Sequence, residues 1–302
     1  MRICNAQSPH KLETAWTKLQ SGRHAGSRSH ERRGVFFVKT IARSVFKLNH
    51  LPCWAREVEV WGNRITATSL DRLLNLYLHH LGVRGGPEKR FLAQHVRPGM
   101  QVLDIGANQG LCTLLLSQIV GKEGHVFAFE PDPVLFYSLR KHCEENGAVN
   151  LELHNIALGH KPGVMKLYRC QVNSGDNRLA KSRHPGWFEE VEVHVAPLDS
   201  ILDATRIDFV KIDVQGWEYQ VFLGMERILR ESPGVKIFFE YWPLGLKSAG
   251  CQPADCLGYL RSLGFSLSRV SALGSTPVRD FEEFTRSLGR RRSVNLFAVR
   301  ET

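Results

Sequence analysis

Short apolar runs alternate with longer segments of helical periodicity along most of the chain. From residue 101 onward, nearly every apolar run is followed by a stretch in which apolar residues recur every three or four positions. This alternation predicts a doubly wound α/β fold with a mostly parallel seven-stranded sheet and helices on both faces. The predicted strands are 102–105, 125–129, 150–154, 208–213, 235–240, 265–270 and 293–299, and the predicted helices are 87–96, 110–120, 132–146, 216–230, 254–263 and 280–288.

Two regions depart from this rhythm. Residues 57–65 alternate around a Gly62-Asn63 turn, which predicts a short hairpin, and a helix is predicted after it over 71–81. Between 160 and 206 two extra strands are predicted, over 163–169 and 189–195, and we interpret them as an inserted hairpin. The predicted domains are an extension over 1–50, a hairpin with helices that pack on the core over 51–100, and the main domain over 101–302.

The turn after the first strand of the main domain has the composition of a ligand-binding loop. Asp104 lies at the strand end, and Gly106 and Gly110 enclose a loop that contains Ala107 and Asn108. Glycine lets the backbone turn sharply and lets a ligand approach it closely. A dinucleotide fingerprint would have its second glycine at 108, where this chain has asparagine. The loop therefore favours a cationic nucleoside over an anionic pyrophosphate.

A second acid follows at the end of the next strand. Glu130 comes 26 positions after Asp104, before Pro131, near the spacing of about 20 at which nucleotide-binding units carry their ribose-binding acid. The pair predicts S-adenosylmethionine as the cofactor, with Asp104 receiving its amino group and Glu130 its ribose hydroxyls. Asn155 and His154, at the end of the third strand, are expected to border the adenine, with no catalytic role for the histidine. The alternative is that both acids only cap turns.

Two further acids close later strands. Asp213 ends an apolar strand that contains Lys211, and Glu240 ends the next strand. Ligands of open parallel sheets bind outside the carboxyl ends of the strands, so we expect both acids near the cofactor. We assign Asp213 as the general base for a hydroxyl acceptor and Glu240 as the second candidate. Two alternatives stay open: Asp213 caps a turn or pairs with Lys211, or the two acids bind a divalent ion; we assign no metal ligand.

The net charge of +10 is concentrated at the N-terminus. Residues 1–50 hold ten basic and two acidic residues, whereas 51–302 holds 30 basic and 28 acidic residues. The main body therefore lacks the electropositive surface of an enzyme that acts on DNA or RNA. Residues 1–33 have a disordered composition, and 34–48 predicts an amphipathic helix that either contacts an anionic membrane or packs on the body.

The cysteines and apolar runs bear on localisation. Seven cysteines without a Cys-x-x-Cys pair favour reduced thiols over disulfides or a zinc site. No apolar run approaches the roughly 20 residues that span a bilayer, and the first thirty residues lack a secretory apolar region. We expect a cytoplasmic protein, with peripheral membrane contact left open.

The chain carries the motifs DIGANQG at 104–110, FEPD at 129–132, NIALG at 155–159, PLDS at 197–200 and KIDVQGWE at 211–218. These motifs resemble those of the FkbM-type S-adenosylmethionine-dependent methyltransferases. The resemblance covers about 58 to 302 and implies the class I methyltransferase fold, with methyl transfer to an oxygen of a sugar, lipid-linked glycan or secondary metabolite. The expected partner is a small-molecule or glycan acceptor. Two alternatives remain: an RNA methyltransferase that uses the basic N-terminal segment, and a non-catalytic protein that only binds the cofactor.

Overall fold

The computed structural model describes residues 56–67, 87–171, 173–181, 188–203, 206–271, 274–289 and 293–300. The chain divides into two units, 1–53 and 54–302, and every described residue lies in the second unit. The predicted extension over 1–50 and the helices predicted over 34–48 and 71–81 lie outside the described residues.

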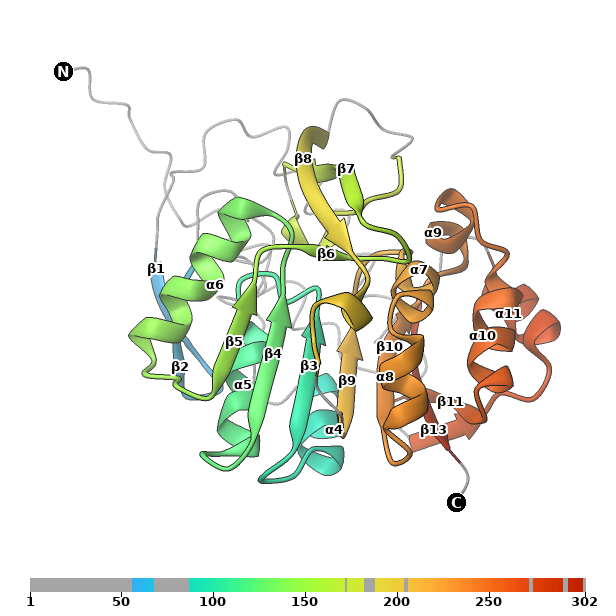
Figure 1. Ribbon diagram of the computed structural model, residues 1–302, viewed down its shortest axis with the longest axis horizontal. Coiled ribbons are helices and arrows are strands. Elements are labelled where there is room, and N and C mark those ends of the chain that lie inside the picture. Colours follow the sequence, from blue (N-terminus) through green and yellow to red (C-terminus); the bar gives the residue numbers. More distant parts are fainter. Residues whose placement is uncertain are drawn as a thin grey trace, which may run out of the picture. The chain divides into compact units, whose positions relative to one another are not determined.

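An eight-stranded sheet lies at the centre of the second unit (Figure 1). Its strand order is β12-β11-β13-β10-β9-β3-β4-β5, and the five strands from β10 to β5 run parallel. The predicted doubly wound α/β fold is confirmed. The eighth strand, β12, was not predicted, because this fully exposed edge strand carries no apolar alternation. The strands are β3 (Gln101–Ile105), β4 (His125–Phe129), β5 (Leu151–His154), β9 (Phe209–Ile212), β10 (Lys236–Tyr241), β11 (Phe265–Ser271), β12 (Gly274–Pro277) and β13 (Val294–Arg300).

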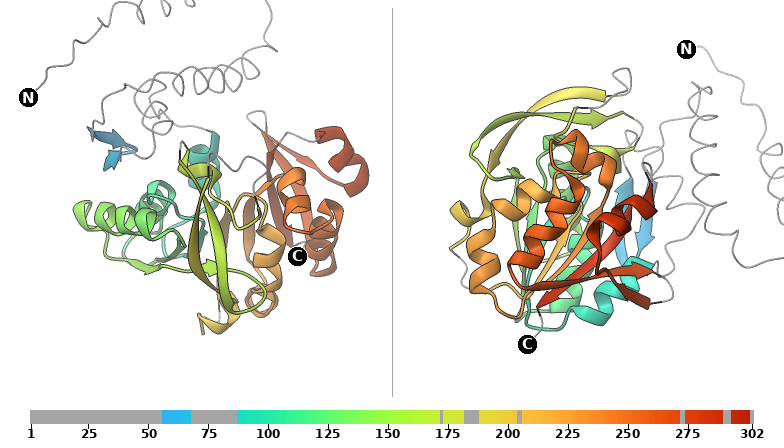
Figure 2. Two further views of the ribbon diagram at one scale, coloured as in Figure 1. Left: turned by 90° about the horizontal axis from the view of Figure 1, so that it is seen from above. Right: turned by 90° about the vertical axis from the view of Figure 1, so that its right-hand side faces the viewer.

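Helices cover both faces of the sheet (Figure 2). On one face, Val102 of β3 packs with apolar residues of α4 and α5. On the other face, its neighbour Leu103 packs with residues of α7, α8 and α10. The predicted helix over 216–230 is two helices, separated where Gly224 packs closely against the backbone of Gly159. The helices are α4 (Pro87–His95), α5 (Leu111–Val120), α6 (Pro133–Glu145), α7 (Glu218–Leu223), α8 (Glu226–Glu231), α9 (Pro243–Ser248), α10 (Pro253–Ser262) and α11 (Phe281–Leu288).

The described residues also form two smaller sheets. The hairpin of β1 (Arg56–Val60) and β2 (Asn63–Ala67) contacts α6, where the backbone N–H of Thr66 donates to His142 Nε2 at 3.0 Å. The inserted segment is a three-stranded sheet in the order β6-β8-β7, which lies over the carboxyl ends of β3, β4 and β9 (Figure 1). Its strands are β6 (Ala157–Leu158), β7 (Gly163–Cys170) and β8 (Phe188–Ala196).

The helices have ordinary dimensions for an α/β protein. Across the described ranges, none combines the length and the apolar character that crossing a bilayer requires.

Candidate cofactor and acceptor site

Acidic side chains gather at the carboxyl edge of the sheet, on the face that α4 and α5 cover. Core residues on that face include Val102 of β3, Phe209 of β9 and Phe238 of β10. Because side chains alternate along a strand, residues an even number of positions further on point to the same face. The acids at those positions are Asp104, Asp213 and Glu240. The structure thus brings together acids that the sequence distributes over 137 residues.

The loop between β3 and α5 is a tight turn against two neighbouring strands. The backbone N–H groups of Gly106 and Ala107 both donate to the carbonyl oxygen of Phe129 at 3.0 Å. Gly106 has a φ of 81°, and a Cβ there would collide with the carbonyl oxygen of Asp213. Gly110, with a φ of 91°, ends the loop before α5. Because the loop lies directly against the residue that follows β9, only glycine fits at position 106.

Glu130 accepts hydrogen bonds from two backbone groups. Its Oε2 accepts from the N–H of Asn108 at 2.8 Å, and its Oε1 accepts from the N–H of Asp132 at 2.9 Å. Burial raises the pKa of Glu130 to about 7 against the lowering effect of these two bonds. Asn155 donates from Nδ2 to the carbonyl oxygens of Glu130 at 2.8 Å and Pro131 at 3.1 Å. Asn155 therefore fixes the backbone beside the acid, and its contact with adenine stays a prediction.

Asp104 is a fully buried member of an ion pair. Its Oδ1 lies 3.2 Å from Lys211 Nζ, and its Oδ2 accepts from Thr113 Oγ1 at 2.7 Å. Lys211 also donates to the carbonyl oxygen of Gly106 at 3.2 Å. Burial lowers the pKa of Lys211, but the surrounding anionic groups, of which Asp104 contributes most, together outweigh burial and hold this pKa well above its usual range. Lys211 thus forms its ion pair with Asp104, and the sequence had suggested Asp213 as the alternative partner.

The two acids assigned to the chemical step share one amide group. Gln215 donates from Nε2 to Asp213 Oδ1 at 2.7 Å and to Glu240 Oε2 at 2.8 Å. Asp213 is exposed, whereas burial and the neighbouring charge of Asp213 raise the pKa of Glu240 to about 8. Sequence reasoning missed Gln215, because its place in the turn does not reveal the left-handed backbone, with a φ of 54°, that directs its side chain.

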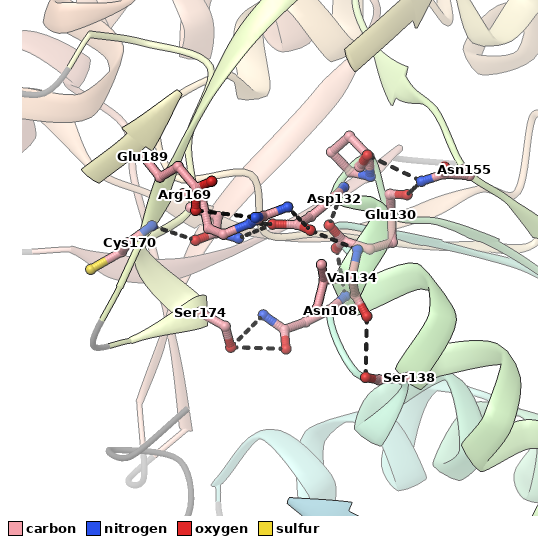
Figure 3. Close-up of polar contacts among 12 residues, drawn as sticks. Asn108, Glu130, Asp132, Val134, Ser138, Asn155, Arg169, Cys170, Ser174 and Glu189 are labelled. Atoms are coloured by element: carbon pink, nitrogen blue, oxygen red, sulfur yellow. Dashed lines mark hydrogen bonds and ion pairs between the residues drawn. The ribbon is translucent and has the colours of Figure 1, made fainter. Parts of the chain in front are cut away.

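The inserted segment contacts Asp132 and Asn108, the two residues whose backbone N–H groups bind Glu130 (Figure 3). Arg169 of β7 donates to both oxygens of Asp132, from Nε at 2.6 Å and from an η nitrogen at 2.8 Å. Asn108 donates from Nδ2 to Ser174 Oγ at 3.1 Å. Since the N–H groups of Asp132 and Asn108 bind the carboxylate of Glu130, the insertion fixes the orientation of this acid.

The same insertion extends to the other end of the site. The guanidinium of Arg178 lies 5.0 Å from the ring centre of Phe188 and 5.1 Å from that of Trp242, two positions after Glu240. Trp242, directly after β10, is thus in contact with the insertion. Trp217, the other tryptophan at a strand end, packs into the core clusters beside the insertion.

His154 has the contacts of a structural residue. The imidazole of His154 stacks on Phe129 with ring centres 4.6 Å apart and lies 2.9 Å from Glu152. Burial lowers the pKa of His154 and outweighs the raising effect of Glu152, which suits a neutral packing residue.

Within the described part of the chain, no three side chains of His, Cys, Asp or Glu gather as metal ligands.

Comparison with known proteins places this geometry in context. Residues 104–267 match the model of the methyltransferase FkbM domain. Over 82 residues the chain is 35% identical to an arsenite methyltransferase of Halobacterium salinarum, an overlap of 27% of this chain and 20% of that protein. Over 145 residues it is 26% identical to Methyltransferase 1 of Beauveria bassiana, covering 41% of this chain and 58% of that protein. The chain thus spans from a fifth to under two thirds of these relatives. The solved structure of an rRNA methylase homologue from Clostridium thermocellum aligns over 71% of this chain and 94% of that one, with a TM-score of 0.46 and 11% identity.

Proposed function

The chain belongs to the methyltransferase FkbM domain family, and on that premise we propose that it methylates a hydroxyl oxygen of a sugar, glycan or secondary metabolite. The methyl donor of this S-adenosylmethionine-dependent family supplies an electrophilic methyl group on a sulfonium. The remaining questions are which residues hold that donor and which group accepts the hydroxyl proton.

The residues around the β3–α5 loop fit the cofactor. Each carboxylate oxygen of Glu130 accepts one backbone hydrogen bond, so each keeps a lone pair for a ribose hydroxyl. The absence of a Cβ at Gly106 lets the loop lie against the end of β9 and keeps the backbone open to a ligand. We therefore propose Gly106, Ala107, Asn108, Gly110, Glu130, Pro131 and Asn155 as the residues around the adenosine.

The observation that carries the O-methylation proposal is the pairing of Asp213 with Glu240 through Gln215. Both acids accept from one amide nitrogen, beside the loop that holds the cofactor. A hydroxyl oxygen becomes a better nucleophile when a carboxylate takes its proton, and such assistance contributes roughly 10² to 10⁴ in rate. Asp213 is exposed and can reach an acceptor, so we assign the proton transfer to it.

Glu240 takes a different part in the proposal. Because its pKa is raised to about 8, Glu240 is mostly protonated at pH 7. A protonated carboxyl group donates a hydrogen bond, which suits an acceptor hydroxyl or ring oxygen.

Single-turnover methyl transfer tests these roles. An acceptor is first found by screening cofactor consumption over sugars, glycolipids, polyketides and RNA. We then expect Asp213→Asn to lower the single-turnover rate by roughly 10² or more with cofactor affinity unchanged, since an amide cannot accept the proton. Glu240→Gln is expected to act mainly on the acceptor KM, and the exposed Asp255→Asn on helix α10 serves as the control.

Three results would contradict the proposal. A near-parental rate for Asp213→Asn would remove the general base and leave proximity as the source of catalysis. Loss of parental activity on chelation, restored by a divalent ion, would assign Asp213 and Glu240 to a metal instead. If RNA is the only substrate methylated in the screen, the proposed small-molecule or glycan acceptor is wrong and the acceptor is RNA.

A further inference from the structure

The acid that the sequence assigned to the cofactor's amino group is not accessible. Asp104 has no exposed surface, and its two oxygens face Lys211 at 3.2 Å and Thr113 at 2.7 Å. An ammonium group could reach the Asp104 carboxylate only if this buried cluster rearranged. The methionine end of the cofactor, which carries an ammonium and a carboxylate, therefore needs another acidic partner.

The strand order indicates where that partner should lie. Glu130 directly follows β4, and β3, with the glycine loop, lies between β4 and β9. A nucleoside with its ribose at Glu130 would extend its methionine end across the loop toward β9. Asp213 and Lys211 are on that side, and helix α4 covers the same face of the sheet.

Glu88 occupies the first turn of α4 on this side of the loop. Its Oε1 lies 3.8 Å from the thiol of Cys112, which is in the first turn of α5, directly after the loop. Burial raises the pKa of Glu88; the Lys211 ammonium opposes this rise, and the charge of Asp213 adds to it. Glu88 nevertheless keeps part of its surface exposed, unlike Asp104. Glu88 is therefore less enclosed than Asp104, and the charges of Lys211 and Asp213 act on its carboxylate.

The balance of charge around Glu88 suits a cation. Lys211 is held by Asp104, and their charges cancel within the protein. The negative charge of Asp213 still acts on Glu88 and contributes to the raised pKa of this carboxyl group. An ammonium group beside Glu88 would relieve this repulsion and form a charge-assisted hydrogen bond.

We infer that Glu88 binds the ammonium group of the methionine part of S-adenosylmethionine, while Asp104 holds Lys211 and the loop in place. This assignment concerns the cofactor alone. It does not depend on the acceptor or on the roles of Asp213 and Glu240 in the chemical step.

Two ligands that differ only at the methionine end separate this assignment from others. S-adenosylhomocysteine carries the amino-acid group, whereas 5′-methylthioadenosine shares its adenosine and thioether but lacks that group. By calorimetric titration, Glu88→Gln should bind S-adenosylhomocysteine about tenfold to a hundredfold more weakly than the parent, which is the range of one charge-assisted hydrogen bond. Its affinity for 5′-methylthioadenosine should stay within about twofold, because neither the ribose nor the loop is changed.

Two controls bracket the measurement. Glu130→Gln should weaken both ligands alike, because both carry the ribose. Glu283→Gln changes a glutamate in the first turn of another helix, α11, and should leave both affinities unchanged. Equal weakening of both ligands by Glu88→Gln, or no weakening of either, would overturn the assignment.

A second substitution keeps the test decisive if Glu88→Gln does not fold. Glu88→Asp keeps the charge but withdraws the carboxylate by one methylene. It should weaken S-adenosylhomocysteine and spare 5′-methylthioadenosine, and parental affinity for both ligands would count against the inference.

Discussion

Removing the charge of Asp104 should destabilise the protein far more than removing an exposed charge. Lys211 is 5% exposed and Asp104 is 0% exposed, so both groups of the ion pair are out of water. In Asp104→Asn the ammonium of Lys211 keeps the Gly106 carbonyl oxygen as an acceptor at 3.2 Å but loses its counter-charge. Breaking a buried pair from one side costs about 3 to 5 kcal/mol. Since small domains are stable by about 5 to 15 kcal/mol, this is a large share of the total.

A double-mutant cycle measures the effect. The free energies of unfolding in urea are compared for the parent, Asp104→Asn, Lys211→Met and the double variant. The two single changes should each be severe, and the double change should cost much less than their sum, because no unpaired charge remains. As a control, Glu226→Gln breaks the exposed pair with Arg230, whose N–O distance is 2.8 Å, and should cost less than about 1 kcal/mol.

The same variants test where the cofactor binds. If Asp104→Asn unfolds with nearly parental free energy but binds S-adenosylhomocysteine much more weakly, the reasoning is refuted and Asp104 is a direct ligand. Additive costs in the cycle would refute the buried pair itself.

Three further changes probe the insertion, a buried acid and the loop. Arg169→Met should weaken S-adenosylhomocysteine binding about tenfold or more by freeing Asp132, as calorimetry would show; unchanged affinity would separate the insertion from the cofactor site. Glu218 is fully buried, and burial raises its pKa from 4.5 to about 7, so its contribution to stability is lost as the pH rises through 7. Glu218→Gln should therefore gain stability relative to the parent between pH 5 and pH 8, by about 3 kcal/mol at most; an equal difference at both pH values in urea unfolding would contradict this. Gly106→Ala should abolish cofactor binding and lower the melting temperature, because its Cβ meets the carbonyl oxygen of Asp213, and parental behaviour in both assays would show that the loop can shift.

Much of the fold could be predicted because its signals are local. Apolar runs and helical periodicity located the strands of the main sheet except β12 and the helices around it except α9, and the inserted strands β7 and β8 were recognised by their break in that rhythm. The prediction of one continuous helix over 216–230 was wrong because it, too, relied on local signals alone. Its periodicity continues across Gly224, and the packing of that glycine against Gly159 comes from a distant part of the chain.

Sequence alone also determined where the acids lie, and the family to which the chain belongs. The position of an acid at a strand end and the alternation of side chains along that strand are properties of a few consecutive residues, which put Asp213 and Glu240 on one face. What each acid contacts was decided by tertiary structure. Lys211 pairs with Asp104 because β9 lies beside β3 in register, although the two residues are 107 positions apart. The link between Asp213 and Glu240 through Gln215, and the hold of Arg169 on Asp132, likewise depend on strand order and on the placement of the insertion, which no local pattern records.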